Sequence, residues 1–276
     1  MRNRSSRWLP LAAMMFLVSC GGDKGTDSGS TDTPPTLDQP ELVTTVDFSS
    51  DDQTALTAQA MVNGFLAAGR AYSSMGAAFF AQQHSANWGH RSGDRWTWSY
   101  SQSGCTFTFT VVQVRNGYNW TYTLDGTCAG EPYDHWVVVD GTTNTDGTTG
   151  TLHYYEENST AIQFSWEWTS AADHKSGIWS FYDGTDVDSN LVATMNWVKN
   201  ADDSEDLVWE NLGGGKTKWE VHVASDGKSG TMTSYGWDDT HSIYWRQFGV
   251  VWNDDGTGTW TTYDDDGNVV NVQSWT

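Results

Sequence analysis

The feature that most constrains the fold of this chain of 276 residues is a repeat in which a glycine precedes a tyrosine or tryptophan by five residues. The copies are Gly93–Trp98, Gly117–Tyr122, Gly150–Tyr155, Gly177–Tyr182, Gly230–Tyr235 and Gly258–Tyr263, with Ser204–Trp209 as a degenerate copy. The last five copies start 27, 27, 26 and 28 residues apart. A nearly constant period is typical of one small structural unit that is stacked many times.

The later copies continue into a second stretch in which apolar and polar residues alternate. These stretches are Ile162–Trp168, Leu191–Trp197, Trp219–Val223 and Phe248–Trp252. Alternation with a period of two indicates a half-buried β-strand, and the DG, NG and GG dipeptides between the stretches are turn signals. The sequence therefore predicts two strands per repeat, with the repeats side by side as a long antiparallel meander over 93–276.

The stretch CTFTFTVVQVRNGYNWTYTLDGTC, from Cys105 to Cys128, predicts one hairpin in detail. With Asn116-Gly117 as a two-residue loop, Cys105 lies opposite Cys128, the aromatic residues share the cysteine face and the threonines occupy the other face. This register pairs Phe107 with Gly126, Phe109 with Leu124, Val111 with Tyr122 and Gln113 with Trp120. We expect a disulfide between Cys105 and Cys128. Two alternatives are a metal site and a redox-active dithiol. A metal site at these two cysteines would lack further ligands, and a redox-active dithiol favours the close CxxC spacing.

One helix is predicted over about 50–83. Ser50-Asp51-Asp52-Gln53 has the form of a capping box, with Ser50 as the N-cap. A stripe at helical spacing follows, made of Val62, Phe65, Leu66, Gly69, Tyr72, Gly76 and Phe80. The other faces carry mostly Ala, Gly and Ser, so we expect an enclosed helix, with Gly69 and Ser73 as the positions where it could break.

These elements predict a mainly β fold: a long antiparallel meander of repeated hairpins, curved into a half-open, barrel-like sheet around one N-terminal helix. The stretch DGTGTWTTYDDDGNVV is loosely similar to MORN-type β-hairpin repeats, although its period is longer. One helix followed by about a dozen antiparallel strands resembles the LolA/LolB lipoprotein-sorting fold in architecture alone. The single domain is expected to span 48–276.

The N-terminus has the layout of an export signal. Three arginines precede an apolar run from Trp8 to Val18, which is too short to span a bilayer. Leu17-Val18-Ser19-Cys20 closely resembles the lipobox of bacterial lipoproteins. That resemblance implies a signal peptide at 1–19, a diacylglyceryl group on the Cys20 thiol and an acyl chain such as palmitate on its amino group. Because Gly21 is not Asp, it also implies the outer membrane as the destination, on its periplasmic face or at the cell surface.

The segment 20–47 reads as the lipidated cysteine followed by a disordered Gly/Ser/Thr/Asp/Pro tether. Without the three arginines of the signal, 11 basic and 35 acidic side chains remain, a net charge of 11 − 35 = −24. So negative a surface repels nucleic acid, which we therefore do not expect as a partner. We expect the lipid on Cys20 to be the only attachment to a membrane.

The 17 tryptophans provide the candidate binding residues. Most share the alternation of the apolar face, which favours a role in the core. Rings on a concave or open face would instead suit apolar or sugar ligands, because they combine apolar faces with polar tips. The candidate ligand-binding residues are Trp96, Trp98, Trp120, Tyr122, Trp179 and Trp245.

No pattern in the sequence predicts catalysis. His84 and His90 flank a Gly-rich turn, which we interpret as a loop between helix and strand. The other five histidines are scattered, and neither an HExxH nor a GxSxG motif is present. The turn Asp183–Asn190 has the oxygen spacing of a calcium loop but lacks its glycine and distal glutamate, so we expect an ordinary solvated turn. No cofactor, metal or catalytic residue is predicted.

Three classes of function follow from these observations. The first is a non-catalytic, membrane-anchored lipoprotein of the cell envelope whose β domain binds or scaffolds. The second is a carrier of lipid or another apolar ligand in a half barrel, and the third is a glycan-binding surface lipoprotein. A hydrolase would require carboxylate or histidine pairs that the sequence does not bring together.

Overall fold

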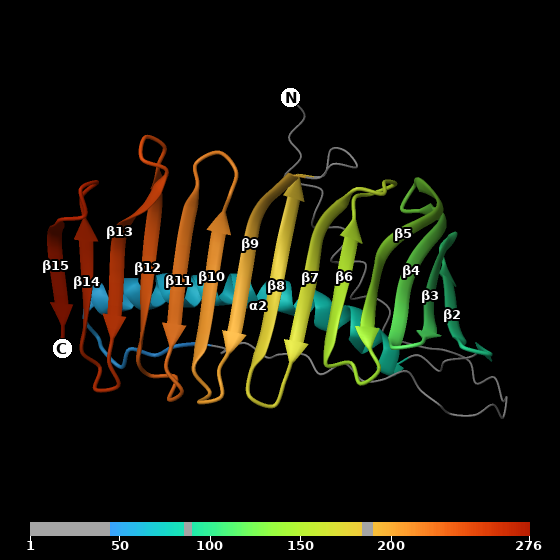
Figure 1. Ribbon diagram of the computed structural model, residues 1–276, viewed down its shortest axis with the longest axis horizontal. Helices are drawn as coiled ribbons and strands as arrows, with labels where there is room; N and C mark the ends of the chain where they lie inside the picture. Colours follow the sequence, from blue (N-terminus) through green and yellow to red (C-terminus); the bar gives the residue numbers. More distant parts are fainter. Residues whose placement is uncertain (1–44, 86–89, 184–189) are drawn as a thin grey trace. The chain divides into compact units, whose positions relative to one another are not determined.

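The computed structural model describes residues 45–85, 90–183 and 190–276, and it contains one α-helix and a single antiparallel sheet (Figure 1). The elements are α2 (Gln53–Ser85), β1 (His90–Ser92), β2 (Arg95–Gln102), β3 (Cys105–Val114), β4 (Gly117–Cys128), β5 (Glu131–Asn144), β6 (Thr149–Tyr155), β7 (Ile162–Ser170), β8 (Lys175–Asp183), β9 (Asn190–Lys199), β10 (Glu205–Asn211), β11 (Thr217–Val223), β12 (Gly230–Asp238), β13 (Ile243–Trp252), β14 (Gly258–Tyr263) and β15 (Val269–Trp275).

The 15 strands follow one another in the sheet in sequence order, from β1 to β15. The sheet does not close into a barrel, because β1 and β15 are the two ends of this order. The predicted fold class, a mainly β antiparallel meander with one helix, is therefore confirmed. No helix among the described residues is both long enough and apolar enough to cross a membrane.

The chain forms two compact units. Unit 1 contains Tyr72–Thr160 and therefore β1–β6, whereas unit 2 contains Pro40–Ala71 and Ala161–Thr276 and therefore β7–β15. The first part of α2 belongs to unit 2 and lies behind its strands in Figure 1.

The repeat of the sequence corresponds to the strand pairs of the sheet. Its glycines or their equivalents stand at or near the first residue of every even-numbered strand from β4 to β14. Two of them show why glycine is needed. A Cβ atom on Gly230 would overlap the Trp252 ring, and one on Gly258 would overlap the Trp275 ring. In the register, Gly230 lies opposite Trp252 and Gly258 opposite Trp275, so each glycine leaves room for an indole that covers the neighbouring strand.

The hairpin β3–β4 has a different register from the one predicted. Val114 pairs with Gly117, so the loop is Arg115-Asn116, and all pairs move by two residues: Phe109 lies opposite Tyr122 and Val111 opposite Trp120. Gly117 is instead the first residue of β4, which packs closely against β5. Glycine is needed there because a Cβ atom would overlap the carbonyl oxygen of Thr143 on β5. A shift of two residues keeps every side chain on its predicted face.

The predicted disulfide is confirmed. Cys105 and Cys128 are bonded, with Cα atoms 4.8 Å apart, and both are buried. The shifted register places Cys105 opposite Gly126 rather than opposite Cys128. Gly126 has a φ of 96° at an irregularity between β4 and β5, and this turn of the backbone lets Cys128 reach back to Cys105.

The helix differs from the prediction in its cap, its continuity and its surroundings. Asp52, not Ser50, caps it, because the Asp52 Oδ1 atom accepts hydrogen bonds from the amides of Thr54 and Ala55, at 2.7 and 3.4 Å. The helix runs unbroken through Gly69 and Ser73. It is also not enclosed, since Leu56 is 44% exposed and Gly64, Ala67 and Ala68 are exposed. Small side chains make up most of this solvent face.

The helix-facing side of unit 2 is a layer of buried tryptophans. Trp166, Trp168, Trp179, Trp197, Trp252 and Trp275 are all buried on it. Phe48 stacks against both Trp252 and Trp275, with ring centroids 5.0 and 5.7 Å apart. Val62 and Leu66 of the helix are buried, and Phe65 stacks against Trp219 at 6.0 Å. Burial of these rings removes a large apolar area from water and so stabilises unit 2.

Candidate functional site

Four of the six predicted binding residues are buried. Trp96, Trp120, Tyr122 and Trp179 are 0–8% exposed. The Trp120 indole donates a hydrogen bond to the Thr143 hydroxyl at 2.9 Å, and burial raises the pKa of the Tyr122 hydroxyl. These side chains therefore contribute to the core of their units in this structure.

The other two, Trp98 and Trp245, are half-buried. Trp98 stacks against Tyr100 with centroids 6.0 Å apart, on the same face as Phe109. Trp245 lies opposite Gly236, on the helix-facing side of unit 2. Cys20 and residues 184–189 of the acidic turn lie outside the described residues, as do the side chains of His84 and His90.

The opposite side of unit 2 carries a cluster that includes none of the six predicted binding residues. On β10–β14, residues that alternate with the buried layer point away from the helix; Lys218 and Glu220, for example, flank the Trp219 that stacks on Phe65. We call this cluster the outer aromatic patch. It consists of Tyr235, Trp237, Tyr244 and Tyr263, with Lys216, Lys218, Arg246, Glu210 and Glu220.

One ring of the patch, that of Tyr244, reaches across the sheet toward β10. The Tyr244 hydroxyl, from β13, donates a hydrogen bond to Glu210 Oε1 on β10 at 2.9 Å. Because β11 and β12 lie between these two strands, the Tyr244 side chain extends over them. Trp237 meets Tyr244 edge-on, with centroids 5.0 Å apart. The result is an aromatic surface that is half-buried from below and open to solvent on top.

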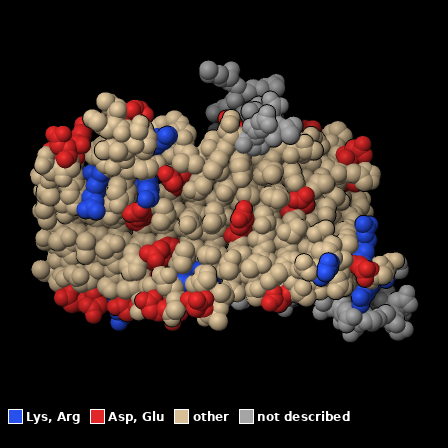
Figure 2. All heavy atoms as spheres, viewed as in Figure 1, with Lys and Arg blue, Asp and Glu red and all other residues tan. Residues whose placement is uncertain are grey.

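Three cations complete the patch. The Lys216 ammonium lies 4.2 Å from the centre of the Trp237 ring, and the Arg246 guanidinium lies 5.3 Å from the centre of the Tyr263 ring. Lys218 forms an ion pair with Glu220, which also accepts a hydrogen bond of 2.9 Å from the Tyr235 hydroxyl. Figure 2 shows the same alternation of basic and acidic side chains over β10–β13 on this face. Of the four basic residues after position 200, three belong to the patch.

These contacts fix the charge state of the patch. Burial, followed by the hydrogen bond to Glu210, raises the pKa of Tyr244 to about 12. Burial alone would raise the pKa of Glu220, but the hydrogen bonds from Lys218 and Tyr235 outweigh it and lower that pKa. The hydrogen bond to Glu220 raises the pKa of Lys218. At neutral pH the Tyr244 hydroxyl therefore remains a donor, and Glu220 and Lys218 stay charged.

Such a surface can recognise a ligand. Aromatic faces stack on apolar CH surfaces, while carboxylates accept, and Lys and Arg donate, hydrogen bonds to hydroxyl groups. Paired charges also keep the patch soluble.

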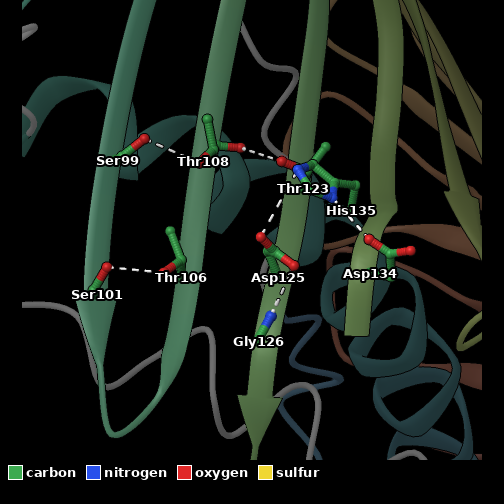
Figure 3. Close-up of polar contacts among 9 residues, drawn as sticks. All are labelled: Ser99, Ser101, Thr106, Thr108, Thr123, Asp125, Gly126, Asp134 and His135. Atoms are coloured by element: carbon green, nitrogen blue, oxygen red, sulfur yellow. Dashed lines mark hydrogen bonds and ion pairs between the residues drawn. The ribbon is translucent and has the colours of Figure 1, made fainter. Parts of the chain in front are cut away.

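Unit 1 has a different polar face, built of hydroxyls. Figure 3 shows how they pair across β2–β4: Ser99 hydrogen-bonds Thr108 at 3.0 Å, and Ser101 hydrogen-bonds Thr106 at 2.9 Å. The Thr123 hydroxyl donates to the Thr108 carbonyl at 3.5 Å. This is the threonine face that the alternation predicts.

A carboxylate–histidine cluster lies at the end of the hydroxyl face. An irregularity in β5 brings Asp134 and His135 beside Asp125 of β4, and His135 has a φ of 49°. His135 Nδ1 lies 3.0 Å from Asp134 Oδ1, and Nε2 lies 3.8 Å from Asp125 Oδ2. Their possible ligand atoms lie within 4.8 Å of one another, which is close enough to share a cation. Asp134 and His135 are largely exposed, however, and the hydrogen bond between them together with the nearby charge of Asp125 accounts for the arrangement, so we assign no metal to it.

The comparisons with known proteins provide no family. No family model matches this sequence, and no curated protein matches it significantly. The resemblances to lipoprotein signals, MORN repeats and the LolA/LolB fold therefore remain predictions.

The sequence contained a signal for the outer aromatic patch. Tyr244-Trp245-Arg246-Gln247-Phe248 is apolar on both faces, as is Ile178-Trp179-Ser180-Phe181-Tyr182. A register shift between Ser234 and Tyr235 leaves Gln247 as an extra residue. It turns Tyr244 and Arg246 outward while Phe248 stays in the buried layer. Alternation alone could not locate that shift.

Proposed function

We propose that this protein is a non-catalytic lipoprotein of the cell envelope, tethered through Cys20, that binds glycan chains on the outer aromatic patch of unit 2. The observation that supports the ligand class is the combination of open rings with flanking donors and acceptors. Sugars present apolar CH faces and many hydroxyls, and the patch offers a surface for each.

The charge of the chain supports the same choice. A mature net charge of −24 disfavours nucleic acid and anionic headgroups as ligands, whereas a neutral sugar has no charge to repel. The tether of about 25 residues between Cys20 and the described domain gives the patch reach above a membrane surface.

The alternative, a lipid carrier, needs space between the helix and the sheet. In unit 2 this region is filled: Val62 and Leu66 are 0% and 3% exposed, and Phe48 lies between two tryptophans of the sheet. The tryptophans that would line an apolar cavity there are buried against one another. The packing of unit 2 therefore favours a ligand on the open face.

The proposal is tested by binding of the purified full chain to polysaccharides. Soluble neutral and anionic polysaccharides are titrated in a calorimeter, and insoluble cell-wall glycan is used in a sedimentation assay. We expect binding that weakens about tenfold or more for Trp237→Ala and for Tyr244→Ala, the loss typical of a central aromatic contact.

Trp98→Ala is the matched control, because Trp98 is also a half-buried ring but lies in unit 1. It should leave binding unchanged. If no polysaccharide binds and native mass spectrometry finds lipid bound to the purified protein, the carrier alternative replaces this proposal. Equal loss in the Trp98 variant would move the site to unit 1.

A further inference from the structure

The last strand of the sheet, β15, is unlike every strand inside it. Among the described strands it pairs only with β14, so its other edge presents unpaired backbone amides and carbonyls. Its sequence, VVNVQSW, contains no charged residue and no proline. Val269, Val270 and Val272 are 58%, 65% and 52% exposed, the first two being the most exposed large apolar side chains of the described residues.

The opposite end of the strand order is protected. The strand β1 has only three residues, His90–Ser92, and includes the exposed Arg91. A short strand with a charged side chain is a poor template for another chain. Only β15 therefore has the length and composition for pairing.

An exposed strand of this kind is a hazard for an isolated molecule. A segment of six or seven residues with high β-propensity, no charge and no proline pairs readily with other strands. Natural sheets protect such edges with lysine, proline, a β-bulge or a covering segment. The strand β15 contains no lysine or proline and no described segment covers it, and its one irregularity lies beside Val270 near its start. The edge therefore fits a specific strand partner.

We propose that β15 pairs with β15 of a second copy of this chain, antiparallel across a two-fold axis perpendicular to the sheet. The axis keeps the outer faces of both copies on the same side. The partner edges are identical, so each supplies the donors and acceptors that the other lacks.

Two features favour a second copy over an unrelated strand. The edge has no charge that would select a partner of opposite sign, and an uncharged strand can lie against itself without like charges meeting on it. The pairing is also self-limiting, because the edges that remain in the dimer are the two short β1 strands. A closed dimer results rather than an open filament.

Repulsion between the two acidic copies opposes this pairing. The turn Asp264–Asp266 lies directly before β15 and comes close to the partner, and each mature chain carries a charge of −24. Because salt screens such repulsion, the dimer should tighten as ionic strength rises. An interface held by surface ion pairs would weaken instead.

The test measures the mass of the purified full chain in detergent by light scattering, over a range of concentrations and salt. We expect the unaltered chain to form a dimer. In the double variant Val270→Lys, Val272→Lys the dissociation constant of that dimer should be at least tenfold higher. Val251→Lys is the matched control: Val251 is also exposed, at 42%, but lies on β13, which is paired on both sides. It should leave the dimer intact.

A monomer at every concentration and salt would overturn the proposal, and so would a dimer that the double variant leaves unchanged. If the double variant unfolds, hydrogen exchange on the unaltered chain decides instead. The amides of Val269–Trp275 should become more protected as protein concentration rises. Protection that does not depend on concentration would contradict pairing between copies.

Discussion

The polar faces of the two units show how much one repeat can vary. In unit 1 this face carries serines and threonines that hydrogen-bond one another, such as Ser99 with Thr108. In unit 2 the corresponding face carries rings, lysines and carboxylates, such as Tyr244 with Glu210. The strand pattern beneath is the same in both.

The apolar faces, by contrast, are alike. Both units bury tryptophans at alternate positions, such as Trp120 in unit 1 and Trp197 in unit 2, and both are less than 2% exposed. The difference teaches that the buried face determines the fold, whereas the polar face is free to acquire a binding function. The following predictions test that division, from the largest expected effect to the smallest.

Removing a buried ring should cost far more than removing a ring of the patch. Trp252→Ala leaves a cavity beside Phe48 and should lower the free energy of unfolding by about 3–5 kcal/mol. Trp237→Ala, on the polar face, should lower it by less than about 1 kcal/mol. Urea denaturation followed by circular dichroism measures both. Similar losses would show that the patch is part of the core.

Loss of the disulfide should affect unit 1 first. Cys105→Ser with Cys128→Ser opens a loop of 23 residues and should cost about 3 kcal/mol. Hydrogen exchange resolved by residue should show the loss of protection in β3 and β4 and little change in β10–β14. An equal loss of protection from exchange in both units would mean that the two units unfold together.

The glycines of the repeat should resist substitution where an indole covers them. Gly258→Ala places a methyl group against the Trp275 ring and should cost about 1–3 kcal/mol. Gly214→Ala is the control, because nothing lies within 4 Å of its Cβ position. It should change the unfolding midpoint very little. A tolerated Gly258→Ala would contradict the packing described for the repeat.

The ion pairs of the patch should matter mainly at acid pH. The lowered pKa of Glu220 means that its contribution to stability is present above its unfolded pKa of about 4.5 and is lost as pH falls through the folded pKa. Because Glu220 is partly exposed, Glu220→Gln should cost less than about 1 kcal/mol at pH 7. The urea midpoint of the variant should also fall less steeply below pH 5 than that of the unaltered chain.

The smallest effect concerns His135. The hydrogen bond to Asp134, aided by the charge of Asp125, raises the pKa of His135 above 6.5. Its contribution to stability is therefore complete below pH 6.5 and is lost as pH rises through the folded pKa. Titration by NMR should show this raised pKa and a lower one in Asp134→Asn. An unchanged pKa in that variant would show that the contact does not form in solution.

The sequence predicted the periodic parts of the fold and missed the irregular ones. Strand pairs, buried faces and the disulfide follow from alternation, because alternation determines which side of a sheet a residue occupies. The register of β3–β4 was wrong because Asn116-Gly117 has the composition of a turn, while Gly117 is required for its contact with Thr143. Contacts with a third strand are not visible in a two-strand pattern.

The candidate site depends on such irregularities. Tyr244 and Arg246 face outward because of one extra residue at Gln247, and His135 meets Asp125 because of a bulge in β5. Neither can be located from side-chain periodicity. The helix cap was misplaced by two residues for a similar reason, since Ser50 and Asp52 are both good capping residues and only the fold selects between them.

The order of the strands has a consequence for how the molecule can change size. Every strand inside the sheet contacts the strands before and after it in the chain, so no pairing depends on a distant segment. Gain or loss of one hairpin by gene duplication or deletion would widen or narrow the sheet by about 10 Å while leaving all other pairs intact. Homologues should therefore differ in length by multiples of roughly 27 residues, the period of the repeat.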